Sequence, residues 1–139
     1  MGSPLPACSV PAIEVLLIQE NPADAFAVRR CLGNAPCSVH VESVVRLDSA
    51  LTVLRMRRFD LVILDVAEDP SLAKLQKLIT RGPEIPVVAI GEWTSEEWQE
   101  KILACGACDY VPKDVLSPLL GVAVSSVARM IHQATAATA

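Results

Sequence analysis

Three short runs of consecutive apolar residues dominate the hydrophobic pattern, at residues 15–18, 61–64 and 87–90. A strand with one face in water alternates apolar and polar residues, whereas these runs do not. They therefore predict strands that are covered on both faces, as in a parallel sheet between two layers of helices. Two weaker segments, at 38–45 and 109–111, complete a set of five predicted strands.

The segments between the strands carry helix signals. Asn21 is a good N-cap, Pro22 suits the first helical position, and Gly33 with Asn34 can end that helix. Five alternating strand and helix segments, joined by right-handed crossovers, predict a three-layer α/β sandwich. The other predicted helices cover 46–58, 70–80, a stretch opened by a capping box at 94–97 with Trp93 and Trp98 as a hydrophobic staple, and 117 to about 132.

The length of 139 residues predicts one domain, at 13–132, between a flexible lead at 1–12 and a flexible tail at 133–139. A net charge of −4 argues against nucleic acid as a partner. No apolar stretch reaches the roughly 18–20 residues that a membrane span needs, and no signal peptide is recognisable. Five cysteines without a regular spacing are typical of a reducing compartment, so we expect a cytoplasmic protein without membrane contact.

Charged side chains follow three of the predicted strands. Glu20, Asp65 and Lys113 come at or just after carboxyl ends, where α/β folds bind their ligands. Two carboxylates can hold Mg²⁺, and a nearby lysine can pair with an incoming phosphoryl group. One carboxylate can then act as the nucleophile that forms an acyl phosphate. The alternative is that each charge merely ends a strand and faces solvent, but their joint placement favours a site.

The chain resembles a response-regulator receiver domain, the phosphoacceptor module of bacterial two-component signalling, over about 13–132. This resemblance implies a flavodoxin-like, CheY-like (βα)5 fold with strand order 2-1-3-4-5. It also implies a signalling phosphoacceptor rather than an enzyme. Its partners would be a histidine kinase or phosphotransfer protein, and an output protein or second copy bound through the fourth and fifth helices. The matching motifs are LLIQENPAD at 16–24, FDLVILD at 59–65, IPVVAI at 85–90 and GACDYVPK at 106–113.

The resemblance also assigns roles to single residues. Asp65 matches the phosphoacceptor and Lys113 the lysine that pairs with the phosphate. Glu20 matches the acid that ligates Mg²⁺, with the backbone carbonyl of Ala67 as a second ligand. Tyr110 matches the aromatic residue whose rotamer reports the switched state.

Two positions depart from the family pattern. Gln19 is neutral where the first of two acids is usual, which predicts weaker Mg²⁺ binding. Gly91 stands where a Ser or Thr hydroxyl normally contacts the phosphoryl group, so the usual link to Tyr110 is missing. These departures favour an alternative function, a pseudo-receiver that binds protein partners without phosphorylation. A third alternative, a flavin- or nucleotide-binding domain, is weaker because no glycine-rich loop follows the first strand.

Two further features have competing interpretations. Cys105 and Cys108 form a C-x-x-C motif, but it lies at a helix C-terminus, where a thiolate is disfavoured. We therefore interpret both as small buried residues rather than a redox or metal pair. The last helix is apolar on more than one face, which predicts a partner surface. Its apolar residues are Leu116, Leu119, Leu120, Val122, Ala123, Val124, Val127, Ala128, Met130 and Ile131.

Overall fold

The computed structural model describes residues 12–35, 37–66 and 71–138, and within them five strands form one parallel sheet. The strand order is β2-β1-β3-β4-β5, which confirms the predicted order. The strands are β1 (Ile13–Ile18), β2 (Val39–Val44), β3 (Leu61–Asp65), β4 (Val87–Gly91) and β5 (Asp109–Pro112).

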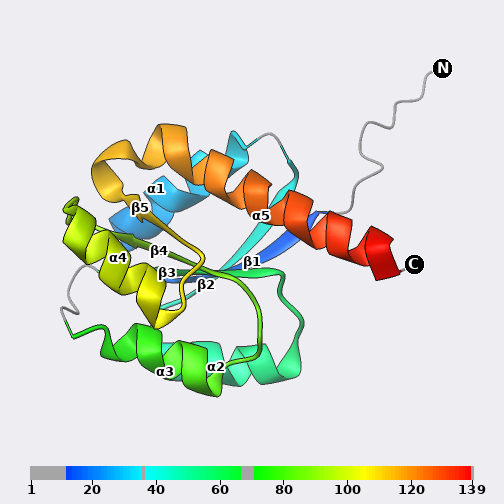
Figure 1. The fold of residues 1–139 in the computed structure, drawn as a ribbon, viewed down its shortest axis with the longest axis horizontal. Coiled ribbons are helices and arrows are strands. Elements are labelled where there is room, and N and C mark those ends of the chain that lie inside the picture. The colour runs from blue at the N-terminus through cyan, green and yellow to red at the C-terminus, as the bar shows by residue number, and fades with distance from the viewer. Residues whose placement is uncertain (1–11, 36, 67–70, 139) are drawn as a thin grey trace.

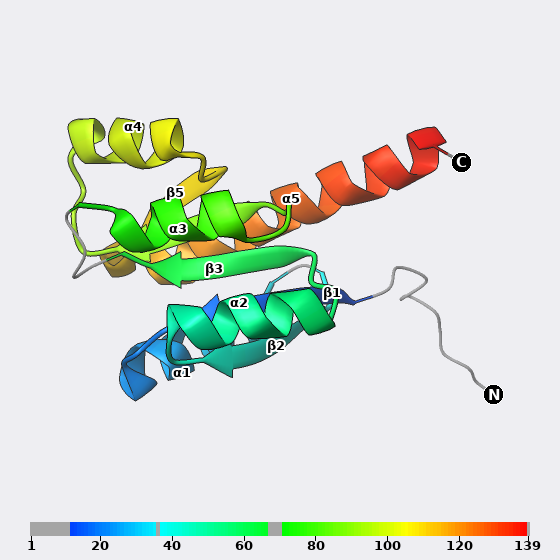
Figure 2. The same cartoon turned by 90° about the horizontal axis from the view of Figure 1, so that it is seen from below.

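Helices cover both faces of this sheet (Figure 1). One core cluster joins the sheet to α1 and α5, and a second joins it to α2, α3 and α4. Figure 2 shows the sheet from below, with α2 and α3 nearest the viewer. The helices are α1 (Pro22–Gly33), α2 (Leu47–Met56), α3 (Ala73–Arg81), α4 (Glu96–Cys105), the short 3₁₀ helix η1 (Lys113–Val115) and α5 (Leu116–Thr138).

The apolar runs are explained by this two-sided burial. Successive side chains of a strand point to opposite faces of the sheet. In β1, Val15 and Leu17 pack in the α1/α5 cluster, whereas Leu16 and Ile18 pack in the α2/α3/α4 cluster. Water reaches neither face of the central strands, so no position in these runs is available to a polar residue.

The N-termini of α1 and α4 are set by side-chain caps. The Asn21 side chain accepts hydrogen bonds from two backbone N–H groups of the first turn of α1, as predicted. In α4 the predicted capping box at 94–97 is wrong: Ser95, not Thr94, is the N-cap, and its hydroxyl accepts from the Trp98 N–H at 3.2 Å. The rings of Trp93 and Trp98 still meet, edge to face, with centroids 4.4 Å apart.

Several helix ends differ from the sequence expectation. α2 and α3 differ by one to three residues at each end, and α5 continues to Thr138 instead of ending near His132. The alanines after His132 favour helix, so the predicted tail is helical up to Thr138. Most of the predicted lead, residues 1–11, lies outside the described residues. In the described part of the chain, no helix is both long and apolar enough to cross a membrane.

Candidate functional site

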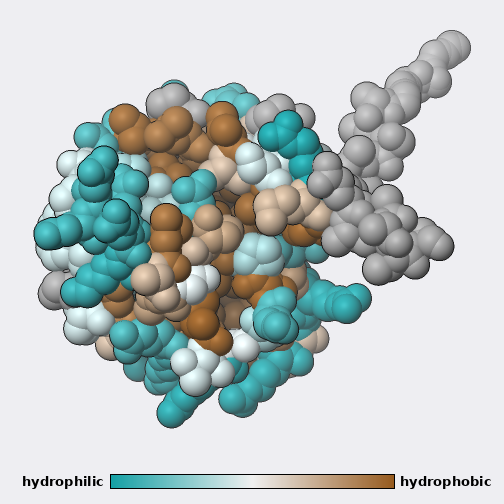
Figure 3. Space-filling view, viewed as in Figure 1, coloured by the Kyte–Doolittle hydropathy of each residue, from teal (hydrophilic) through white to brown (hydrophobic). Residues whose placement is uncertain are grey.

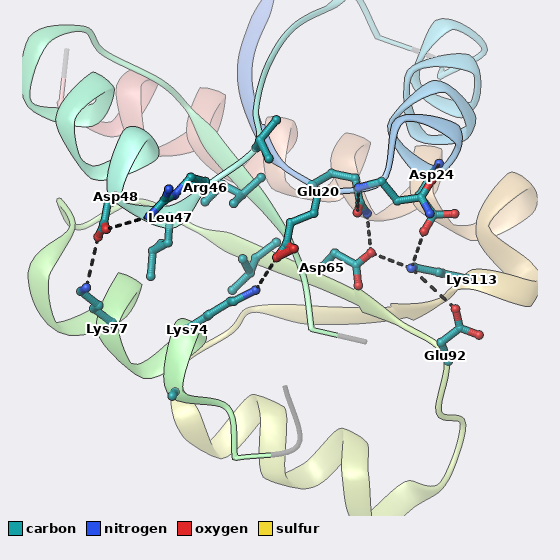
Figure 4. A pocket seen from close by; sticks show the side chains of 16 residues that line it. Glu20, Asp24, Arg46, Leu47, Asp48, Asp65, Lys74, Lys77, Glu92 and Lys113 are labelled. Atoms are coloured by element: carbon teal, nitrogen blue, oxygen red, sulfur yellow. Dashed lines mark hydrogen bonds and ion pairs between the residues drawn. The ribbon is translucent and has the colours of Figure 1, made fainter. Parts of the chain in front are cut away.

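The strand register brings the carboxyl ends of β1, β3, β4 and β5 to one edge of the sheet. Ile18 pairs with Leu64, and Asp65 with Ile90. A pocket of about 580 Å³ opens at this edge, lined by the strand ends and by residues of α1, α2 and α3 (Figure 4). All three residues that the sequence pattern singles out, Glu20, Asp65 and Lys113, line this pocket.

Asp65, the last residue of β3, is held by two donors. Its side chain is 10% exposed, and its Oδ2 lies 2.6 Å from the Lys113 ammonium. The same oxygen accepts a hydrogen bond from the Gln19 side-chain amide. Gln19 is buried, and its Oε1 accepts from the Asn21 N–H at 2.9 Å, which fixes the amide orientation. The neutral residue at position 19 is therefore a donor to the candidate acceptor, a role that the sequence reasoning did not assign to it.

Lys113 lies among three carboxylates. Besides Asp65, its Nζ contacts Asp24 Oδ2 at 2.8 Å and lies 3.7 Å from Glu92 Oε2. Burial alone would lower the pKa of Lys113, but hydrogen bonds and charges from Asp24 and Asp65 outweigh it and raise that pKa. The lysine therefore stays positively charged over the physiological pH range, next to the carboxylate that the sequence analysis predicts to be the acceptor.

Glu20 does not join this group. Its exposed side chain turns towards α3, where its Oε2 lies 3.0 Å from the Lys74 ammonium (Figure 4). The structure thus brings Asp65 and Lys113 together as the sequence analysis predicts, but places Asp24, not Glu20, beside Lys113. Sequence reasoning missed Asp24, although the Asn21 cap signals that position 24 lies in the first turn of a helix that starts at this edge.

The side chains that line the pocket include two predicted ligands of Mg²⁺, Asp65 and Glu20. Mg²⁺ usually takes one or two carboxylates and several waters. Here Oδ2 of Asp65 is engaged by an ammonium and an amide, and the Glu20 carboxylate is paired with Lys74. Among the described residues, no three His, Cys, Asp or Glu side chains form a metal-binding group. The two carboxylates predicted to bind Mg²⁺ are therefore both paired with lysines in this structure; the predicted carbonyl ligand, Ala67, lies outside the described residues.

Gly91 and Tyr110 are in direct contact. Tyr110 is buried, and its hydroxyl donates a hydrogen bond to the Trp93 carbonyl at 2.7 Å. A Cβ at position 91 would lie 2.7 Å from the Tyr110 oxygen, which is closer than real Cβ atoms approach. Burial raises the pKa of Tyr110, so the hydroxyl stays protonated. The tyrosine therefore occupies space that any side chain at position 91 would need.

The pKa values of the C-x-x-C motif argue against a reactive pair. Burial raises the pKa of the Cys105 thiol, and burial together with the Asp109 charge raises that of Cys108, so both stay protonated. The expectation that both are buried is wrong, because Cys105 is half-buried and Cys108 is exposed. Gly106 between them ends α4 with φ 123°, a conformation that glycine adopts readily.

The comparisons with known proteins show the family to which the chain belongs. The family model of the response regulator receiver domain matches residues 15–125, so the chain belongs to the family of receiver domains found in two-component systems. The two-component response regulator ARR10 of Arabidopsis thaliana is 34% identical over 82 residues, which are 57% of this chain and only 15% of that protein.

Two solved structures extend the comparison to nearly the whole fold. A response regulator from Thermotoga maritima has a TM-score of 0.74 at 22% identity, covering 86% of this chain and 99% of its own, and supports the fold alone. A response regulator receiver protein from Burkholderia phymatum has a TM-score of 0.67 at 27% identity, covering 84% of this chain and 94% of its own.

The contact between Gln19 and Asp65 leads to a first prediction. Gln19→Glu replaces a buried donor by a second carboxylate, so we expect it to lower the free energy of unfolding by about 1–3 kcal/mol at pH 7. Urea unfolding measures this loss of stability. It is done once with NaCl and once with MgCl₂, each at about 10 mM, a concentration that suits a weak cation site. We expect MgCl₂ to restore part of the loss, and Gln19→Ala to show no such restoration. Equal stabilities of Gln19→Glu and wild type would contradict the assigned contact.

Proposed function

We propose that this receiver domain accepts a phosphoryl group on Asp65 from a histidine kinase or a phosphotransfer protein. A carboxylate oxygen of Asp65 attacks the phosphorus of a phosphohistidine, the O–P bond forms, and the P–N bond breaks. The released imidazole takes up a proton from solvent. The observation that carries this proposal is the 2.6 Å pair between Lys113 and Asp65 at the open pocket.

Lys113 supplies the charge that this step needs. A phosphoryl group brings negative charge to Asp65, and a charged ammonium within hydrogen-bond distance offsets it. We propose that Mg²⁺ binds only weakly, because Glu20 has to leave Lys74 before it can act as a ligand. We also propose that the domain is a cytoplasmic signalling acceptor rather than an enzyme, with its own acyl phosphate as the product.

The test is the intact mass of the protein after incubation with acetyl phosphate, with and without MgCl₂. We expect the wild type to gain the mass of one phosphoryl group and Asp65→Asn to gain none. Because Mg²⁺ binding is expected to be weak, the gain should rise only gradually with MgCl₂. A well-folded wild type that gains no mass would contradict the proposal.

A second candidate, a protein-interaction module that works without phosphorylation, is favoured by the Gly91–Tyr110 contact. Tyr110 is already buried and bonded to the Trp93 carbonyl, with no hydroxyl at position 91 to link it to the acceptor. On this candidate the signal-bearing surface has the same shape whether or not Asp65 carries phosphate.

The surface for such contacts lies on α4 and α5. Figure 3 shows apolar side chains gathered along α5 and over the surface between α4 and α5. Of the apolar residues predicted to form a partner surface, most are buried against the sheet, and three are exposed, at 46%, 57% and 60%. These are Leu119, Val122 and Met130, and Leu103 of α4 is also exposed. Light scattering before and after acetyl phosphate treatment separates the candidates, since only the first expects association to change.

A further inference from the structure

Asp24 is the one acidic residue in the first turn of α1, and its carboxylate lies in the acceptor site. Its Oδ2 is 2.8 Å from the Lys113 ammonium, almost as close as Oδ2 of Asp65 at 2.6 Å. The Lys113 side chain is 16% exposed and that of Asp24 36%, so water screens this ion pair less than a surface pair.

The local sequence fixes where Asp24 lies. The Asn21 side chain accepts hydrogen bonds from the Ala23 N–H at 2.8 Å and the Asp24 N–H at 3.2 Å. This cap, followed by Pro22, anchors the first turn of α1 at the edge of the sheet. The carboxylate of Asp24 therefore extends from a rigid backbone at the positive end of the helix dipole, where a negative charge is favoured.

We propose that Asp24 is a positioning residue of the acceptor site, which holds the Lys113 ammonium against Asp65. This inference rests on the proposed phosphoacceptor function. It assigns to Asp24 an action on Asp65 through Lys113, and not a contact with the phosphoryl group itself.

The geometry of the ammonium supports this role. A lysine ammonium has three N–H donors on a flexible four-carbon stem, which is costly to order. Asp65 from β3 and Asp24 from α1 both contact it, from different directions (Figure 4). Glu92, at 3.7 Å and exposed, is a weaker contact. Without Asp24, the stem keeps one strong anchor and gains freedom to move off the acceptor.

The chain offers a closely matched control. Asp48 is likewise the acidic residue in the first turn of its helix, α2, and it lines the same pocket. Its Oδ1 lies 3.2 Å from a lysine ammonium, that of Lys77 on α3. Asp48→Asn therefore removes the same charge from the same pocket and from the first turn of a helix, without touching Lys113.

The experiment measures two quantities in the full chain: the rate of phosphorylation by acetyl phosphate, and the labelling of Lys113 by acetic anhydride at pH 8, mapped by peptide mass. We expect Asp24→Asn to slow phosphorylation about tenfold, as the loss of one charge-assisted hydrogen bond implies. We expect it also to raise Lys113 labelling several-fold. Asp48→Asn should change both by less than about twofold, and Asp24→Glu, which restores the charge, should recover part of the protection of Lys113.

The two readouts separate this inference from the proposed function. If the wild type takes up no phosphoryl group, the proposed function fails, and labelling alone decides whether Asp24 holds Lys113. Unchanged labelling in Asp24→Asn, or equal effects of Asp24→Asn and Asp48→Asn, would overturn the assignment. Thermal unfolding checks that the variants are folded. If Asp24→Asn is unfolded, the labelling of Lys113 in Asp24→Glu is compared with that in wild type. A strong rise in this labelling would overturn the assignment of Asp24.

Discussion

Replacing Gly91 by alanine is expected to lower the free energy of unfolding by about 1–3 kcal/mol, the usual cost of overpacking a well-packed interior. The added Cβ would lie 2.7 Å from the Tyr110 oxygen and 3.2 Å from its Cε1. Moving the Tyr110 side chain aside would cost free energy, because its ring is buried and its hydroxyl donates a hydrogen bond to the Trp93 carbonyl. Urea unfolding followed by tryptophan fluorescence measures the loss.

The control for Gly91→Ala is the same change in a Tyr110→Phe background. Phenylalanine lacks the oxygen nearest to the new Cβ, so the clash is relieved and the alanine should cost less there. A double-mutant cycle then gives a coupling of about 1 kcal/mol between the two positions. Equal costs in both backgrounds would show that Tyr110 does not occupy the space above Gly91.

The result bears directly on signalling. If the coupling is found, a serine or threonine at position 91 is incompatible with the buried Tyr110, because each has a Cβ at the same place as alanine. Restoring the hydroxyl that is usual in the family would then move Tyr110 away from Trp93 even without phosphate. The glycine at position 91 is therefore what leaves room for the buried Tyr110 hydroxyl.

Lys113→Met is expected to cost about 2–4 kcal/mol of stability at pH 7. The change leaves Asp24 and Asp65 close together without the ammonium that lies between them. Removing one partner of a buried ion pair costs about 3–5 kcal/mol. We expect somewhat less here, because the side chains of Asp24 and Asp65 both keep some contact with water. Urea unfolding of Lys113→Met and of Lys77→Met, a lysine whose partner is more exposed, measures the difference.

The pH dependence of Lys113→Met follows from the raised pKa of Lys113. A pKa that folding raises above the ordinary value of 10.5 stabilises the protein fully below that pH, and this stabilisation is lost as the lysine deprotonates at higher pH. The raised pKa of Tyr110 acts in the same direction. Wild type should therefore lose stability above pH 10.5 more steeply than Lys113→Met; parallel curves would contradict the role of this lysine.

The fold could be predicted well from the sequence, because the apolar runs and helix caps that indicate it depend on residues close together in the chain. Continuous apolar runs require burial on both faces, and that requirement alone implies helices above and below a parallel sheet. The N-cap of α1 is equally local, since Asn21 contacts residues only two and three positions ahead. The fourth helix start was misplaced by one residue, because Thr94 and Ser95 are both good caps and only packing selects between them.

The site was predicted less completely, because side-chain direction is not a local property. Glu20 and Asp24 are both acidic and close in sequence to the end of β1. Glu20 pairs with Lys74 on α3, away from Asp65, whereas Asp24 pairs with Lys113 at the end of β5, beside Asp65. Likewise, the sequence shows a glycine at position 91 and a tyrosine at 110. Only the folded chain shows that the tyrosine hydroxyl occupies the space where a side chain at position 91 would lie.

The contacts of the candidate acceptor site join parts of the chain that are far apart in sequence. Gln19 and Asp65 are 46 positions apart, and Lys113 and Asp24 are 89 positions apart. No local segment can form this group of side chains, so it exists only after β1, β3 and β5 have taken their places in the sheet. A partner that recognises the assembled site therefore binds only molecules in which β1, β3 and β5 have joined the sheet.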